Sequence, residues 1–152
     1  MLRVSCDHRY SMPSVKASRH EIGQSLVEVA VSFVILIILL EGAVDLGRAL
    51  FALISIRDAA QEGAFYGSVN PTDTNGIIQR VRSSSNAPVD MSDASKVNVT
   101  VSIIGPTCSG GTVQVTVTYN FQFITPIVPL VLPGPITLHT TMTSVILAPV
   151  CP

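Results

Sequence analysis

The chain has 152 residues, of which 47% are hydrophobic and only 12% are charged. Soluble domains carry about 25% charged residues, so the composition disfavours an ordinary soluble protein and indicates one domain with a membrane anchor. The net charge is −1 at pH 7, and the basic residues do not gather on a folded segment, which disfavours a nucleic-acid binder.

The first 23 residues are polar and show no apolar periodicity, so we expect a leader without fixed structure over residues 1–23. Basic residues outnumber acidic ones here, with Arg3, Arg9, Lys16 and Arg19 against Asp7 and Glu21. Positive charge beside a membrane span favours the cytoplasmic side. The sequence therefore predicts a cytoplasmic N-terminus.

An apolar segment follows the leader, and from Val29 to Leu40 its one polar side chain is Ser32. A helix over Gln24–Val44 would be about 31 Å long, which matches the roughly 30 Å hydrocarbon core of a bilayer. We therefore expect a single transmembrane helix. A soluble core helix and a cleaved secretory signal remain alternatives, although no clear small-x-small cleavage site follows the apolar run.

Glu28 near the start of this span has two interpretations. Ser25 and Glu28 have the spacing of a capping box, which would make Glu28 part of a helix cap. Alternatively, a carboxylate within the hydrocarbon costs a few kcal/mol and needs a proton or a cation. Cleavage after Gly23 would supply such a cation, the new α-amino group of Gln24.

The helical pattern continues past the span to about Ser68, where Asn70 and Pro71 end it. Its apolar face is predicted to hold Leu46, Leu50, Leu53, Ile54 and Ala60, with Asp45, Arg48, Asp58, Gln61 and Glu62 facing water. Small residues recur every four positions at Ala59, Gly63 and Gly67. Such a stripe allows close helix packing, either against this chain's own β domain or against neighbouring helices.

Residues 70–152 predict a small extracytoplasmic domain. A short helix is expected over Ile77–Arg82, and strands over Val97–Ile103, Val113–Phe123 and Ile136–Leu147, where apolar and polar residues alternate. The fold class is therefore α+β: a long N-terminal transmembrane helix that extends into a three- or four-stranded antiparallel sheet. The apolar, proline-rich segment Ile124–Pro135 is either a lid over the core or a docking patch.

Cys108 and Cys151 would both be extracytoplasmic in this topology, where disulfides persist. A bridge between them would close a loop of roughly forty residues and stabilise the fold by about 3–4 kcal/mol. Free thiols or an intermolecular bond are the alternatives.

The sequence contains no phosphate-binding glycine loop, no zinc-ligand spacing and no nucleophile with a plausible base. We therefore expect a non-enzymatic protein with no cofactor, no metal and no small-molecule substrate. The turn cluster Pro71–Gly76 lacks the ligand alternation and the distal Glu of a calcium loop.

Three segments of the chain resemble TadE-like proteins, minor pseudopilins of the tight-adherence (Tad/Flp) pilus system within the type IV pilin-like group. These segments are Gly23–Glu28 leading into the apolar run, Gly42–Leu50 and Ala59–Gly67. The resemblance implies an inner-membrane protein whose partners are other pilins, a pilus assembly platform and a prepilin peptidase. It also implies peptidase cleavage between Gly23 and Gln24, with Glu28 acting in helix assembly.

A second functional hypothesis is a single-span surface binding module that never enters a pilus. The two hypotheses differ on Glu28. An assembly subunit needs this carboxylate for complex formation, whereas a simple anchored module tolerates Gln at the same position.

Overall fold

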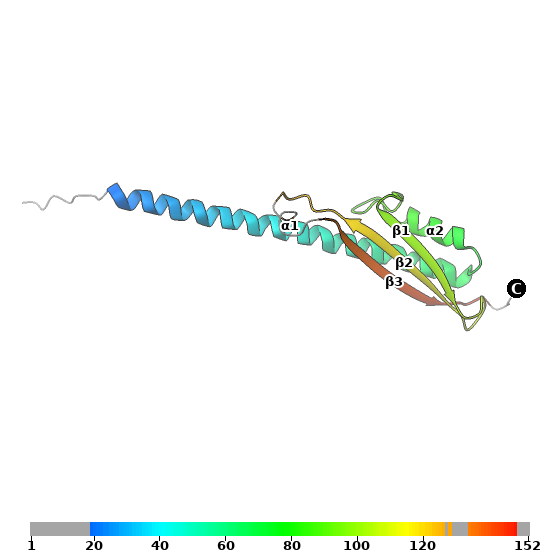
Figure 1. The fold of residues 1–152 in the computed structure, drawn as a ribbon. Coiled ribbons are helices and arrows are strands. Elements are labelled where there is room, and N and C mark those ends of the chain that lie inside the picture. The colour runs from blue at the N-terminus through cyan, green and yellow to red at the C-terminus, as the bar shows by residue number, and fades with distance from the viewer. Residues whose placement is uncertain (1–18, 127, 129–133, 149–152) are drawn as a thin grey trace, which may run out of the picture. The chain divides into compact units, whose positions relative to one another are not determined.

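The computed structural model describes residues 19–126, 128 and 134–148, with side chains from Gly23 onward. The chain divides into two units, Met1–Ile37 and Ile38–Pro152. The elements in chain order are α1 (Arg19–Val69), α2 (Thr74–Ser83), β1 (Val97–Ile104), β2 (Thr112–Phe121) and β3 (Ile136–Val145) (Figure 1). The predicted α+β class, a long apolar helix followed by an antiparallel sheet, is confirmed.

Helix α1 begins at Arg19 rather than at the predicted Gln24. No proline interrupts the sequence from Arg19 to Val69, so the backbone stays helical throughout. Ser25 consequently lies inside the helix instead of at its first turn. The capping-box interpretation of Ser25 and Glu28 is therefore wrong for the chain with its leader, because an N-cap residue must precede the helix.

Helix α1 ends before Pro71, and α2 follows after a short turn. Asp73 is the N-cap of α2, and its Oδ1 accepts a hydrogen bond of 2.9 Å from the Gly76 amide. The Tyr66 hydroxyl donates to the other Asp73 oxygen at 3.0 Å, which fastens the start of α2 to α1. The buried side chains of α2 itself are Ile77 and Val81.

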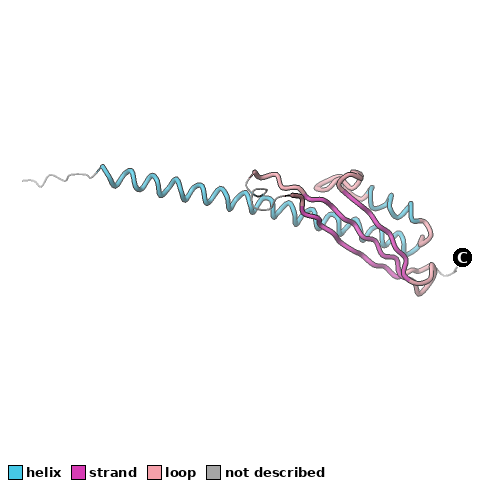
Figure 2. Tube along the Cα trace, in the orientation of Figure 1, coloured by secondary structure: helices cyan, strands magenta, loops and turns pink. Residues whose placement is uncertain are grey.

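The three strands form one antiparallel sheet in the order β1-β2-β3 (Figure 2). In β1 and β2 the register runs from Val97 opposite Tyr119 to Ile104 opposite Thr112. In β2 and β3 it runs from Thr112 opposite Val145 to Phe121 opposite Ile136. Alternate residues of β2 are fully buried at Val113, Val115 and Val117, which is the period of a strand with one covered face.

In the second unit the helix meets the sheet through small residues, and this corrects the predicted apolar face. The buried hydrophobic side chains of α1 are Ala52, Ile56, Ala59, Ala60 and Ala64. Of the residues expected to be buried, only Ala60 is; the others, Leu46, Leu50, Leu53 and Ile54, are 39–63% exposed. Small side chains let the helix backbone approach the valine-rich sheet closely, so the bulky residues face outward.

Candidate functional site

The first unit is an apolar helix whose side chains are uncovered. Leu26, Phe33 and Leu36 are each at least 60% exposed, and none of the most apolar 18-residue window is buried. A core helix of a soluble protein is mostly buried, so the uncovered side chains disfavour that alternative. In the part of the chain that the structure describes, this is the one helix long and apolar enough to cross a membrane, judged by length and composition.

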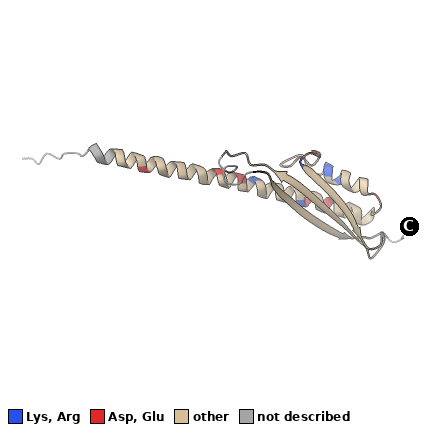
Figure 3. Ribbon diagram, in the orientation of Figure 1, with Lys and Arg blue, Asp and Glu red and all other residues tan. Residues whose placement is uncertain are grey.

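Glu28 is the one charged side chain between Gly23 and Leu40. Figure 3 shows how sparse charged positions are along the first half of α1. It lies in a shallow groove along the helix, between Ser25 and Ser32. Within the described residues its carboxylate makes no hydrogen bond or ion pair. The group is therefore open to a donor or a cation from outside this part of the chain.

The predicted cleavage position lies in the same helix. Gly23 and Gln24 are both exposed, and both have helical backbone in α1. A Cβ added at Gly23 would meet nothing within 4 Å. The peptide bond between the two residues is therefore unshielded by the rest of the described chain.

Asp45 joins the helix to the segment that follows β2. Its side chain is only 2% exposed, although the sequence pattern predicted a solvent-facing position. One carboxylate oxygen, Oδ2, accepts from the Thr125 hydroxyl at 2.5 Å and from the Thr125 amide at 3.3 Å. The other, Oδ1, accepts from the Ile124 amide at 3.4 Å. These bonds fasten the chain leaving β2 to the helix just beyond the predicted span.

Arg48 completes this junction. Its Nη1 lies 3.0 Å from Asp45 Oδ1, so the two residues form an ion pair. Its guanidinium also lies over the Phe121 ring, 5.2 Å from the ring centre. Asp45 and Arg48 belong to the Gly42–Leu50 segment, so this part of the family resemblance coincides with a helix-to-sheet junction.

The small-residue stripe packs within the chain. Ala59 is 1% exposed, and Gly63 and Gly67 are buried. A Cβ at Gly67 would lie 2.9 Å from Ile77 Cδ1 and 3.0 Å from Val113 Cγ2. The structure therefore places the stripe against α2 and the sheet of the same molecule rather than on a surface for neighbouring helices.

Cys108 lies in the loop between β1 and β2 and is 7% exposed. The Ser109 amide donates to the Ala148 carbonyl at 2.8 Å, so this loop lies beside the segment that leaves β3. Cys151 lies outside the described residues, and its bridge to Cys108 stays a prediction. The predicted lid or docking segment lies largely outside them too, because residues 127 and 129–133 are not described.

The loop before β1 is held by local hydrogen bonds to aspartates. Asp93 Oδ1 accepts from the Ser95 hydroxyl at 2.6 Å and from the Ser95 amide at 3.0 Å, and Lys96 Nζ lies 3.2 Å from Oδ2. These contacts, the Ser95 hydroxyl foremost, hold the pKa of Asp93 below its ordinary value. Among the described side chains, no three His, Cys, Asp or Glu come together as metal ligands.

Comparison with known protein families gives a match within helix α1. The family model described as TadE-like protein matches residues 23–64, which include Glu28, Asp45 and Arg48. No curated protein and no solved structure matches the chain. The resemblance carried by the sequence motifs is thereby confirmed over residues 23–64, where the chain matches the TadE-like family model.

Proposed function

We propose that this protein is a non-enzymatic minor pseudopilin that takes part in assembling an adhesive Tad/Flp-type pilus. It is anchored in the inner membrane by α1, with its N-terminus cytoplasmic and its β domain outside. The observation that carries the proposal is the uncovered apolar helix with a lone carboxylate, located within the segment that the TadE-like family model matches.

Physical chemistry gives the helix a role in assembly. An ionised carboxylate in hydrocarbon costs a few kcal/mol unless a cation neutralises it. Glu28 has no partner among the described residues, and cleavage after Gly23 would place an α-amino group four residues before it. Such an amino group on this chain would neutralise Glu28 within the subunit, whereas one on a neighbouring pilin helix would convert that cost into an attraction between subunits.

The first test identifies the mature N-terminus of the protein purified from its native membrane. Trypsin cuts after Arg19 and Arg48, so an unprocessed chain yields the peptide His20–Arg48. Cleavage by a prepilin peptidase yields Gln24–Arg48 instead. Recovery of His20–Arg48 alone would contradict processing, and a start beyond Ala43 would reveal an ordinary cleaved signal and overturn the membrane-helix model.

The second test compares Glu28→Gln with Glu41→Gln, the same substitution near the other end of the predicted span. Glu41 has one buried carboxylate oxygen without a hydrogen-bond partner in the described structure, so neutralising it removes no observed contact. We expect Glu28→Gln to abolish co-purification with other pilins, while Glu41→Gln preserves it. If Glu28→Gln also leaves the complexes intact, the protein is an anchored surface module.

A further inference from the structure

Strand β3 lies at the edge of the sheet, and one hydrogen bond beside it shows which of its residues direct their backbone groups toward β2. The Ile146 amide donates to the Gly111 carbonyl at 2.9 Å, so residue 146 points its backbone groups toward β2. Adjacent residues of a strand point these groups to opposite sides, so even-numbered residues of β3 face β2. The odd-numbered residues direct their N–H and C=O groups away from β2. They are Thr137, His139, Thr141, Thr143 and Val145.

Nothing in the described residues pairs with this outer edge, because β3 has β2 as its one neighbour in the sheet. The edge also lacks the features that normally prevent strand addition, since β3 contains no charged residue, no proline and no glycine. All five outward-pointing residues are exposed. At the opposite edge of the sheet, β1 is accompanied by α2 (Figure 1).

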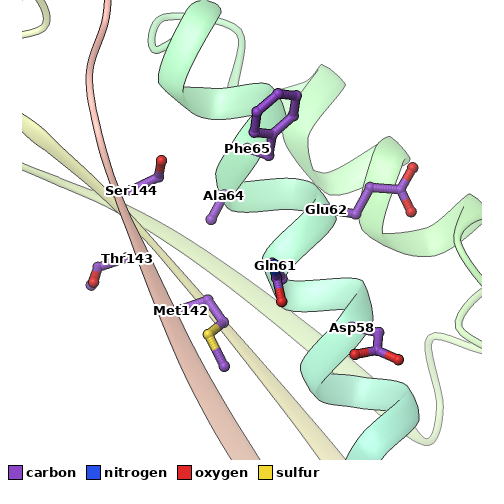
Figure 4. A pocket seen from close by; sticks show the side chains of 8 residues that line it. All are labelled: Asp58, Gln61, Glu62, Ala64, Phe65, Met142, Thr143 and Ser144. Carbon is purple, nitrogen blue, oxygen red and sulfur yellow. The ribbon is translucent and has the colours of Figure 1, made fainter.

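A groove lies between β3 and α1 within the second unit. Its volume is about 730 Å³, and β3 contributes Met142, Thr143 and Ser144 to its wall (Figure 4). Asp58 and Glu62 of α1 are also among its lining residues, and no lining residue is basic. Phe65, which is 71% exposed, lines the groove too. The groove therefore combines unpaired backbone groups, negative charge and an exposed aromatic ring.

We propose that β3 receives a fourth strand from a partner protein, through an extended segment that carries a basic side chain opposite Met142, on the sheet face that α1 covers. The free backbone groups supply the main-chain hydrogen bonds of strand addition. Asp58 makes no ion pair or hydrogen bond within the described residues, so its carboxylate is available to the basic side chain. This inference is independent of the pilus role, because it concerns the sheet rather than the apolar helix.

The sequence of β3 argues against a second copy of this chain as the donor. Pairing of two β3 strands about a twofold axis would place β3 of the second copy along the groove. Strand β3 contains no lysine or arginine, so it would bring neither of these side chains to Asp58. A distinct partner segment has no such restriction.

The experiment measures amide hydrogen exchange of β3 in the full-length protein, in native membranes and after purification in detergent. We expect the five outward amides to exchange at least about tenfold more slowly in native membranes, where the partner is present. Thr143→Pro removes one outward N–H without removing a β2–β3 bond, since an edge strand tolerates proline on its free side. This variant should lose the protection, whereas Thr143→Val, which keeps the N–H, should retain it.

Three exchange results would overturn the proposal. Fast exchange in both settings means that no strand adds, and slow exchange in both means that residues of this chain already cover the edge. Equal loss of protection in Thr143→Val and Thr143→Pro means that a side chain, not the backbone edge, is recognised. If Thr143→Pro does not fold, Asp58→Lys serves instead, because it reverses an exposed charge that has no partner in the described residues. Unchanged exchange protection of β3 in Asp58→Lys would contradict an attraction between Asp58 and a basic side chain of the partner.

A photo-crosslinking amino acid at position 65 identifies the donor. The expected crosslinked peptide comes from a different protein and has alternating residues with a basic one among them. A peptide from a second copy of this chain, or a segment without a basic residue, refutes the proposed occupant.

Discussion

Removing the Asp45 carboxylate tests whether the helix-to-sheet junction stabilises the second unit. In Asp45→Ala, the Thr125 hydroxyl and the amides of Ile124 and Thr125 lose their acceptor, and Arg48 loses its ion partner. A hydrogen bond to a charged group contributes about 1.5–3 kcal/mol, and a longer or neutral one about 1 kcal/mol. The two amide bonds exceed 3.2 Å and Arg48 is 38% exposed, so we discount these contributions.

The expected loss is about 2–4 kcal/mol in the free energy of unfolding, which lowers the melting temperature by roughly 10 °C in a domain of this size. Far-UV circular dichroism of the detergent-solubilised protein measures it. Asp58→Ala is the matched control on the same helix, because Asp58 has no partner in the described structure, and its effect should stay within about 0.5 kcal/mol. A melting temperature of Asp45→Ala equal to that of the control would refute the reasoning.

Three further predictions concern the same unit. Gly67→Ala should lower the free energy of unfolding by about 1–3 kcal/mol through overpacking, whereas Gly47→Ala, whose Cβ meets nothing within 4 Å, should stabilise the helix slightly in the same thermal melt. The folded-state pKa of Asp93 lies below its unfolded value, so its stabilising effect is complete above about pH 4 and is lost as pH falls through the folded pKa. The difference in melting temperature between the wild-type protein and Asp93→Asn should therefore shrink as the pH falls through that range. A difference that stays constant with pH would contradict the prediction. Cys108→Ala should cost about 3–4 kcal/mol if the bridge to Cys151 forms, and thiol labelling of the unreduced, denatured protein should then find both cysteines blocked.

Much of the architecture follows from local sequence patterns. Alternation of apolar and polar residues located all three strands, because a strand with one covered face must alternate. The long apolar run predicted the exposed helix, and Pro71 marked its C-terminal end. The start at Arg19 was missed because polarity and lack of periodicity argued for disorder, whereas those residues are helical in the structure.

The position of Asp45 shows why the junction was missed. The buried stripe of α1 continues from Asp45 through Ala49, Ala52 and Ile56, which have helical spacing. A buried face defined by the largest aliphatic residues leaves Asp45 on the opposite, solvent-facing side of the helix. A carboxylate in line with alanines was a usable sign of burial, but its partners, Ile124 and Thr125, lie about eighty residues later in the chain.

The sequence by itself determined the elements, a helix long and apolar enough to cross a membrane, and the TadE-like motifs, because these depend on neighbours within a few residues. Only the tertiary structure decided which helix face meets the sheet, what holds Asp45 and which sheet edge stays open. The physical reason is that backbone approach controls this packing: Gly63 and Gly67 admit the valines of α2 and β2 at distances that larger side chains would prevent. No local pattern of hydrophobicity reveals that choice, since large aliphatic residues also lie on the exposed side of the helix.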